Sequence, residues 1–171
     1  ERIYIPRIHV ASIETCGCVS EFDKATGQLT VWMTTQAPHA IRTVLALVAG
    51  HVGLQEDKIR VISPDIGGGF GQKVLFFYPD ELLVPFAAMQ LKRPVKYIED
   101  RRENFIGSTQ ERTQIHYIEL YSDKDGRISA LNDYFLHDTG AFIPYGIAIA
   151  QVASTSIAGP YDIPNIKVRF Q

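Results

Sequence analysis

The sequence lacks several features that would assign the chain to a class at once. Its only cysteines, Cys16 and Cys18, lie too close together to form an easy disulfide framework, which favours a reducing compartment, the cytoplasm. Basic residues are not in surplus, since 17 Lys and Arg stand against 19 Asp and Glu, so charge gives no argument for a nucleic-acid partner. The sequence has no run of about 18 apolar residues and no signal-peptide pattern, so we expect no membrane span.

Residues that could bind a metal directly are scattered along the chain. Its histidines show no i, i+4 pair, so no histidine metal site is expected. They are His9, His39, His51, His116 and His137. Cys16 and Cys18 form one C-x-C pair without a second, which favours free thiols in a strand over a metal or redox pair. The sequence therefore predicts no metal ion held by protein side chains.

Apolar and polar residues alternate in several stretches that predict β-structure. Two hairpins are expected, each around a short polar turn that contains glycine, over residues 16–35 and 112–138. Single strands are expected over residues 58–65, 94–100 and 165–171.

Two stretches with helical spacing lie between these strands, over residues 37–53 and 79–93. Pro38 suits a first helical turn, and Pro85 is expected near the start of its helix, where proline is tolerated. Because strands outnumber helices and pair partly as hairpins, we expect an α+β fold. It would have a mixed sheet, two main helices on one face and a long second hairpin. The 171 residues are expected to form a single domain.

Two further segments carry weaker signals. "YGIAIAQVASTSIAG", residues 145–159, is apolar and rich in small residues, which favours a buried, closely packed segment. "EDRRENF", residues 99–105, mixes charges of both signs and is interpreted as a loop that faces solvent or another subunit.

The most unusual stretch is "VISPDIGGGFGQK", residues 61–73, directly after a predicted strand. Its spacing fits neither a phosphate-binding P-loop, since Gln72 precedes Lys73, nor a dinucleotide fingerprint. Two interpretations remain open. Bare backbone amides could approach a bulky anionic or oxo-bearing ligand, with Phe70 covering one side. Alternatively, the stretch is a tight turn with Phe70 in the core.

Several stretches resemble one family in the same order along the chain. "DIGGGFGQK" is similar to the glycine-rich loop of the molybdenum hydroxylases, the xanthine oxidase and aldehyde oxidase family, and most of all to the carbon monoxide dehydrogenase large subunit and its relatives. "IETCGCVSEFD", "TTQAPHAIR", "KRPVKYIEDRRENF", "QERTQIH", "HDTGAF" and "GPYDIPN" resemble further segments of that family. The resemblance covers nearly the whole chain and is to the N-terminal part of the molybdopterin-binding domain.

The resemblance implies roles for particular residues. Gln36 falls where a glutamine of the family donates a hydrogen bond to a metal-bound oxygen, and is the expected catalytic residue. Gly68, Gly69, Phe70 and Gly71 fall on the loop that passes the molybdopterin cofactor, with Phe70 on the substrate side. Gly67 is expected to be structural. No protein residue binds the metal directly.

Departures from the family pattern limit these expectations. Val74 stands where purine-oxidising members carry a glutamate, which argues against a xanthine-type substrate. The general base and most cofactor contacts of the family lie far downstream, so the chain is expected to be a fragment or a split subunit, and inactive alone. Arg112 matches a recurring basic position, but no role follows for it, and none for Cys16 or Cys18.

The function implied is part of a molybdopterin-dependent dehydrogenase or hydroxylase that oxidises a small substrate, with water as the oxygen source. The substrate classes are carbon monoxide, aldehydes and N-heterocycles. The expected partners are the remaining large-subunit segments, a flavin subunit with FAD and an iron–sulfur subunit with [2Fe–2S] clusters. The alternative is a non-catalytic α+β structural or assembly domain whose glycine loop is only a turn.

Overall fold

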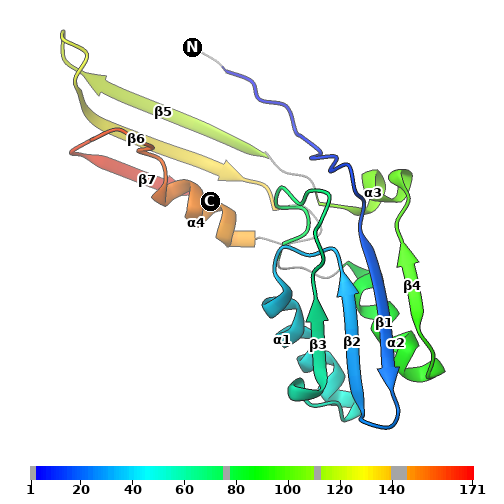
Figure 1. The fold of residues 1–171 in the computed structure, drawn as a ribbon. Helices are drawn as coiled ribbons and strands as arrows, with labels where there is room; N and C mark the ends of the chain where they lie inside the picture. The colour runs from blue at the N-terminus through cyan, green and yellow to red at the C-terminus, as the bar shows by residue number, and fades with distance from the viewer. Residues whose placement is uncertain (1–2, 75–77, 110–112, 140–145) are drawn as a thin grey trace. The chain divides into compact units, whose positions relative to one another are not determined.

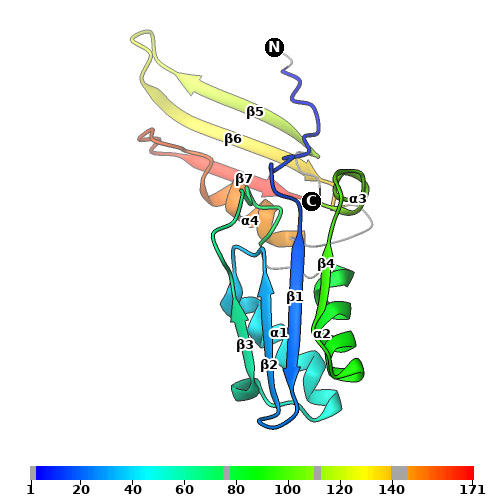
Figure 2. The ribbon, with the colours of Figure 1, turned by 45° about the vertical axis from the view of Figure 1, so that its right-hand side comes forward.

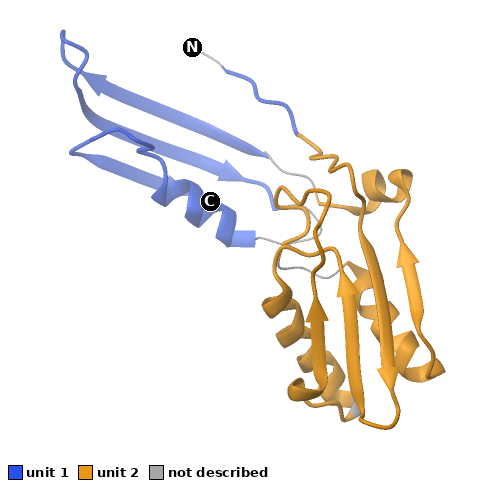
Figure 3. Ribbon diagram, in the orientation of Figure 1, with its two compact units in different colours: residues 1–7, 111–171 blue, residues 8–110 orange. Residues whose placement is uncertain are grey.

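The structure is a computed structural model that describes residues 3–74, 78–109, 113–139 and 146–171. The chain folds into two compact units (Figure 3). Unit 1 comprises Glu1–Arg7 and Glu111–Gln171, and unit 2 comprises Ile8–Gln110. Each unit has its own β-sheet, and the expectation of a single domain stays a prediction.

Unit 2 is built on a four-stranded mixed sheet in the order β3-β2-β1-β4 (Figure 1). Strands β1 (Gly17–Asp23) and β2 (Gln28–Met33) form the antiparallel hairpin predicted from the sequence. Strand β3 (Ile59–Ile62) pairs with β2 in parallel, and β4 (Val95–Ile98) pairs with β1 antiparallel. The single strands expected in these two regions are therefore confirmed.

Two helices cover one face of this sheet (Figure 2), as expected. Helix α1 (Pro38–Ala49) begins with proline at its first turn and continues into a short 3₁₀ helix, Gly50–Val52. Helix α2 is Pro79–Leu91, and a second short 3₁₀ helix, Glu56–Lys58, precedes β3. The buried residues that join helices and sheet include Ile41, Leu45, Val84, Leu29, Val31 and Met33. They make an apolar core on the helix side of the hairpin.

Two expectations for unit 2 are wrong. Pro85 lies six residues after Pro79, well inside α2, and not near its start. The helix continues through it because Val84 and Ala88 are buried beside it, and this burial offsets the lost backbone hydrogen bond. Residues expected as a charged loop form helix α3 (Arg101–Gly107).

The start of α3 is fixed by a capping box. The side chain of Asp100 accepts a hydrogen bond from the Glu103 N–H at 2.8 Å. The Glu103 side chain accepts one from the Asp100 N–H, also at 2.8 Å. Each carboxylate accepts a hydrogen bond from a backbone N–H that has no partner inside the helix. The acidic residues of this segment therefore stabilise the start of a helix.

Unit 1 contains the predicted second hairpin, formed by β5 (Gln114–Ser122) and β6 (Ile128–His137). Strand β7 (Ile166–Phe170) pairs with β6 in parallel and completes a three-stranded sheet. Arg112, for which no role follows from the sequence, lies outside the described residues.

The small-residue segment near the end of the chain was expected to be buried, and in its described part this is wrong. It forms helix α4 (Gly146–Thr155), in which Ala150 is buried, but Ile147 is 74% exposed and Val152 is 61% exposed. The physical reason is that a short helix beside a three-stranded sheet can bury only one side within this unit. Across the described stretches of the chain, none of the helices has the length and apolar character that crossing a membrane requires.

Candidate functional site

The parallel pairing of β2 and β3 brings the two most informative sequence segments together. Gln36 lies just after β2, and the glycine loop follows β3. Carboxyl ends of neighbouring parallel strands meet at one edge of a sheet, where α/β proteins commonly place ligands. The Gln36 N–H donates to the Lys73 carbonyl at 2.8 Å, and Ser63 Oγ donates to the Thr35 carbonyl at 2.7 Å. One backbone–backbone bond and one side-chain–backbone bond therefore join the two segments.

The side chain of Gln36 lies against the glycine loop. Its Oε1 accepts hydrogen bonds from the Gly71 N–H at 3.1 Å and from the Lys73 N–H at 3.3 Å. These two donors identify the oxygen of the amide and fix its direction. Within the described part of the chain, Gln36 Nε2 has no hydrogen-bond partner. The loop therefore holds an exposed glutamine by its oxygen and leaves its donor nitrogen available.

The glycines are required by close packing and by backbone conformation. A Cβ added at Gly69 would overlap Gln36 Cδ and Oε1 and lie 2.6 Å from Cγ. Gly68 and Gly71 have φ of +101° and +90°, in the region that favours glycine. Gly67 packs on Glu14, whose Cβ an added Cβ would overlap. A structural role for Gly67 agrees with this contact.

Phe70 does not belong to the core. Its side chain is 70% exposed, and its φ is +51°, which is uncommon for a bulky residue. The ring lies over Gly68, where an added Cβ would come 2.6 Å from Phe70 Cε2. The interpretation of the loop as a turn with Phe70 in the core is therefore wrong. An exposed aromatic held in a left-handed conformation is strain of the kind found at ligand sites.

The loop presents backbone donors that the fold does not use. Among the residues that the structure describes, the N–H groups of Gly68, Gly69 and Phe70 have no hydrogen-bond acceptor. Successive amides around residues of positive φ form concave sites that bind anions. Together with Gln36 Nε2, these amides are hydrogen-bond donors that the described residues leave without an acceptor, which fits a group rich in acceptor oxygens. No group of three or more His, Cys, Asp or Glu able to hold a metal occurs in the described ranges.

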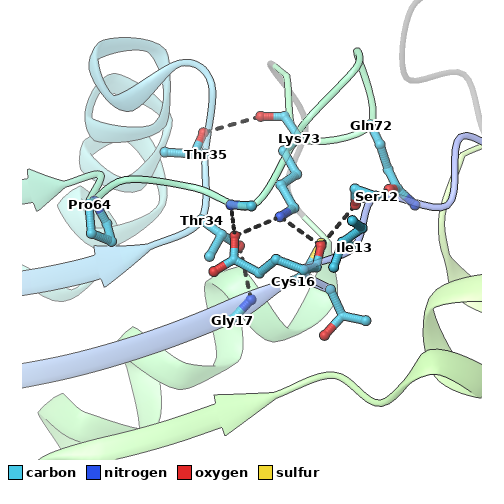
Figure 4. Close-up of polar contacts among 12 residues, drawn as sticks. Ser12, Ile13, Cys16, Gly17, Thr34, Thr35, Pro64, Gln72 and Lys73 are labelled. Carbon is cyan, nitrogen blue, oxygen red and sulfur yellow. Dashed lines mark hydrogen bonds and ion pairs between the residues drawn. The ribbon is translucent and has the colours of Figure 1, made fainter.

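Glu14 and Lys73 were missed by the sequence analysis. Lys73 Nζ donates to Glu14 Oε2 at 3.1 Å and to the Glu14 carbonyl at 3.0 Å. Figure 4 shows the Lys73 side chain with its polar contacts as dashed lines. No sequence pattern connects a lone glutamate with a lysine 59 residues later. The available signal was a lysine two residues after the last glycine of the loop, at a spacing that a phosphate-binding lysine does not have.

Unit 2 also contains buried ionisable groups that favour their neutral forms. Cys16 and Cys18 are free, buried thiols, as expected, and burial raises the pKa of the Cys18 thiol to about 12. Burial also raises the pKa of the Cys16 thiol. Glu81 in α2 is buried, and desolvation raises the pKa of its carboxyl to about 8. These thiols are not nucleophiles at neutral pH, because the reactive form is the thiolate.

Comparisons with known proteins agree on one family. The family profile described as "Molybdopterin cofactor-binding domain" matches residues 1–171. The carbon monoxide dehydrogenase large chain of Hydrogenophaga pseudoflava is 40% identical over 171 residues, which cover 96% of this chain and 20% of that protein. The nicotine 6-hydroxylase large subunit of Paenarthrobacter nicotinovorans is 38% identical over 174 residues, covering 99% of this chain and 21% of that protein.

A solved structure gives the same result. Quinoline 2-oxidoreductase from Pseudomonas putida 86 matches with a TM-score of 0.84 and 37% identity, covering 96% of this chain and 21% of that one. The chain therefore spans about a fifth of the length of the relatives that it matches. These relatives are large chains or subunits of oxidoreductases that contain further subunits, so the likeness concerns one part of a larger assembly.

Proposed function

Because this chain belongs to the molybdopterin cofactor-binding domain family, we propose that it supplies part of the cofactor site of a molybdopterin-dependent dehydrogenase or hydroxylase. The complete enzyme oxidises a small substrate with water as the oxygen source. Its substrate class is carbon monoxide, an aldehyde or an N-heterocycle, which are the classes that the family resemblance implies. The relatives whose names mention carbon monoxide, nicotine and quinoline support this range.

The observation that carries the proposal is the set of donors around Gln36. The amide oxygen of Gln36 is engaged by Gly71 and Lys73, so Nε2 is the end that can donate to a ligand. The amides of Gly68, Gly69 and Phe70 add backbone donors in the same loop. We assign these residues to the bound cofactor and its substrate, with no direct metal ligand among them.

When bound, the cofactor would supply two-electron redox chemistry and activate water. The residues of this chain bind and orient. Gln36 donates a hydrogen bond without bringing charge, and because two loop amides hold its oxygen, it needs little reorientation at the moment of reaction. Gly69 leaves the space that Gln36 occupies, and exposed Phe70 lines the substrate side.

The proposed enzyme needs more than this chain. The 171 residues match about a fifth of the relatives, so we propose that they form the N-terminal part of the molybdopterin-binding domain and are inactive alone. The general base, the other cofactor contacts, a flavin subunit with FAD and an iron–sulfur subunit with [2Fe–2S] clusters come from elsewhere. The two free cysteines support a cytoplasmic location as part of the same proposal.

Metal and pterin analysis of the complete protein tests this function. We expect molybdenum and pterin to copurify with it, and dye reduction with a substrate of one of the three classes. A folded complete protein that carries neither molybdenum nor pterin would instead support the structural or assembly domain.

A further inference from the structure

Glu14 contacts both ends of the glycine loop. At the start of the loop, the Glu14 N–H donates to the Gly67 carbonyl at 3.2 Å, and Glu14 Oε2 accepts from the Gly67 N–H at 2.7 Å. At the end of the loop, Lys73 Nζ donates to the same Oε2 at 3.1 Å and to the Glu14 carbonyl at 3.0 Å. Glu14, which lies outside the loop, therefore joins Gly67, the first glycine, to Lys73, which lies two residues after the last glycine.

The environment of Lys73 makes this pairing unusual. The Lys73 side chain is fully buried, at 0% exposure, whereas the Glu14 side chain is 40% exposed. A buried ammonium group needs a counter-charge and acceptors, and among the described residues Glu14 supplies both to Lys73 Nζ. Lys73 therefore depends on Glu14, and through its backbone N–H it also bonds Gln36 Oε1.

The segment that carries Glu14 is itself held firmly. Arg101 of α3 donates through one guanidinium nitrogen to the carbonyls of Ser12 at 2.6 Å and Ile13 at 2.8 Å. Ser12 Oγ donates to the Glu14 carbonyl at 2.8 Å and lies 3.2 Å from Gln72 Oε1, beside the loop. Figure 4 shows Ser12 and Gln72 next to each other and Lys73 reaching toward the same segment. Glu14 is thus a fixed anchor and not a side chain of a loose N-terminal stretch.

We propose that Glu14 and Lys73 are a positioning pair that fixes the glycine loop, so that its unused amides and the Gln36 amide nitrogen face the cofactor. This inference rests on the proposed function for the identity of the ligand, but the ordering of the loop can be measured without it. Neither residue touches the reacting atoms. They act through Gly67 and Gln36.

Two variants of the complete protein test the pair. Glu14→Ala removes the carboxylate that bonds the Gly67 N–H and Lys73 Nζ. Glu14→Gln keeps a side chain of the same length with an acceptor oxygen and removes only the charge. The matched control is Glu56→Ala, which breaks the partly exposed ion pair between Arg42 and Glu56 at 3.6 Å in the same unit. Hydrogen–deuterium exchange of residues 62–74 is measured in cofactor-free protein, and molybdenum content is measured per folded protein.

We expect Glu14→Ala to speed exchange in residues 62–74 by about tenfold or more and to leave the β1–β2 hairpin unchanged. Molybdenum content should fall in the same variant, Glu14→Gln should recover part of both effects, and Glu56→Ala should change neither. Any of three results for Glu14→Ala would overturn the positioning role. They are unchanged exchange in the loop, faster exchange across the whole of unit 2, and faster exchange in the loop with full molybdenum content. Wild-type protein without molybdenum would instead refute the proposed function, while the exchange measurement would still test the pair.

Discussion

Gly69 and Gln36 are in direct contact, because the Gln36 side chain fills the space that a Cβ of residue 69 would occupy. The same glutamine accepts hydrogen bonds from the Gly71 and Lys73 amides. The glycine loop and the glutamine are therefore one structure, in which the bare backbone at Gly69 lets the loop hold the amide. This contact explains the absence of a side chain at Gly69 without reference to positive φ, which Gly69 does not have.

Gln36→Ala should reduce turnover of the complete enzyme on the order of 10²-fold, because it removes an oriented donor that carries no charge. The fold should remain intact, since the side chain is exposed. Steady-state kinetics and the melting temperature measure the two effects.

Gln36→Glu is the matched control for that variant. It keeps an oxygen that the Gly71 and Lys73 amides can bond, but it replaces the donor nitrogen with an acceptor. Turnover should fall as in the alanine variant. Wild-type turnover in the glutamate variant would show that donation from Nε2 has no role.

Gly69→Val should displace Gln36 and cause loss of the cofactor before it affects folding. The added side chain would overlap Gln36 Cδ and Oε1. The Gln36 side chain can move away because it is exposed and flexible. Molybdenum content and melting temperature are measured on the same complete protein. Gly50→Ala is the control, because Gly50 has a helical φ of −57° and nothing within 4 Å of an added Cβ.

The control should keep full cofactor content and be unchanged or slightly stabilised, by about 0.5–1 kcal/mol. A Gly69→Val protein that melts at a lower temperature yet keeps full molybdenum in its folded fraction would contradict the cofactor interpretation of the loop.

Glu81 should make the stability of the protein fall as pH rises from 4.5 to 8. Desolvation raises the pKa of this carboxyl from its usual 4.5 to about 8 in the folded protein. In that window the folded chain keeps a proton that the unfolded chain releases, so raising the pH favours unfolding. Glu81→Gln keeps an acceptor for the Tyr78 N–H and has no proton to lose.

The Glu81→Gln variant should therefore be more stable than wild type at pH 8, on the order of 4 kcal/mol, and no more stable at pH 4. Thermal melting of the complete protein at several pH values measures this, with exposed Glu21→Gln in β1 as the control. Parallel pH profiles for wild type and Glu81→Gln would mean that Glu81 is ionised in the folded protein at neutral pH.

The isolated 171-residue chain should bind no molybdenum and show no dehydrogenase turnover. The chain covers 20% of the carbon monoxide dehydrogenase large chain that it resembles, and the general base and most cofactor contacts are proposed to lie outside it. Metal analysis and dye reduction with carbon monoxide, aldehydes and N-heterocycles check this. Turnover by the isolated chain would contradict the proposed division of the site.

Local patterns predicted most of the elements, because their physical causes are local. Alternation around a glycine turn gave the β1–β2 hairpin, and Pro38 with apolar spacing gave α1. Helix α3 could have been predicted too, since Asp100 and Glu103 have the spacing of a capping box. Its mixed charges favoured instead a loop that faces solvent or another subunit.

What the sequence did not predict depends on contacts between distant residues. The resemblance placed Gln36 and the glycine loop at one site, but only the parallel pairing of β2 with β3 shows why they touch. The contact of Glu14 with Lys73 spans 59 residues and follows no motif. The exposure of Ile147 in α4 depends on what packs beside that helix, and composition does not specify this.

A crystal structure of the complete protein with its cofactor is the most direct test of the central claim, that Gln36 and the glycine loop face the cofactor. We predict that Gln36 Nε2 and at least one amide of Gly68, Gly69 or Phe70 lie within hydrogen-bond distance, about 2.7–3.2 Å, of cofactor oxygens or sulfurs or of the metal's own ligands. Gln36 Oε1 should still accept from the Gly71 amide. A cofactor bound elsewhere, with Gln36 and the loop facing only solvent or protein, would contradict the account.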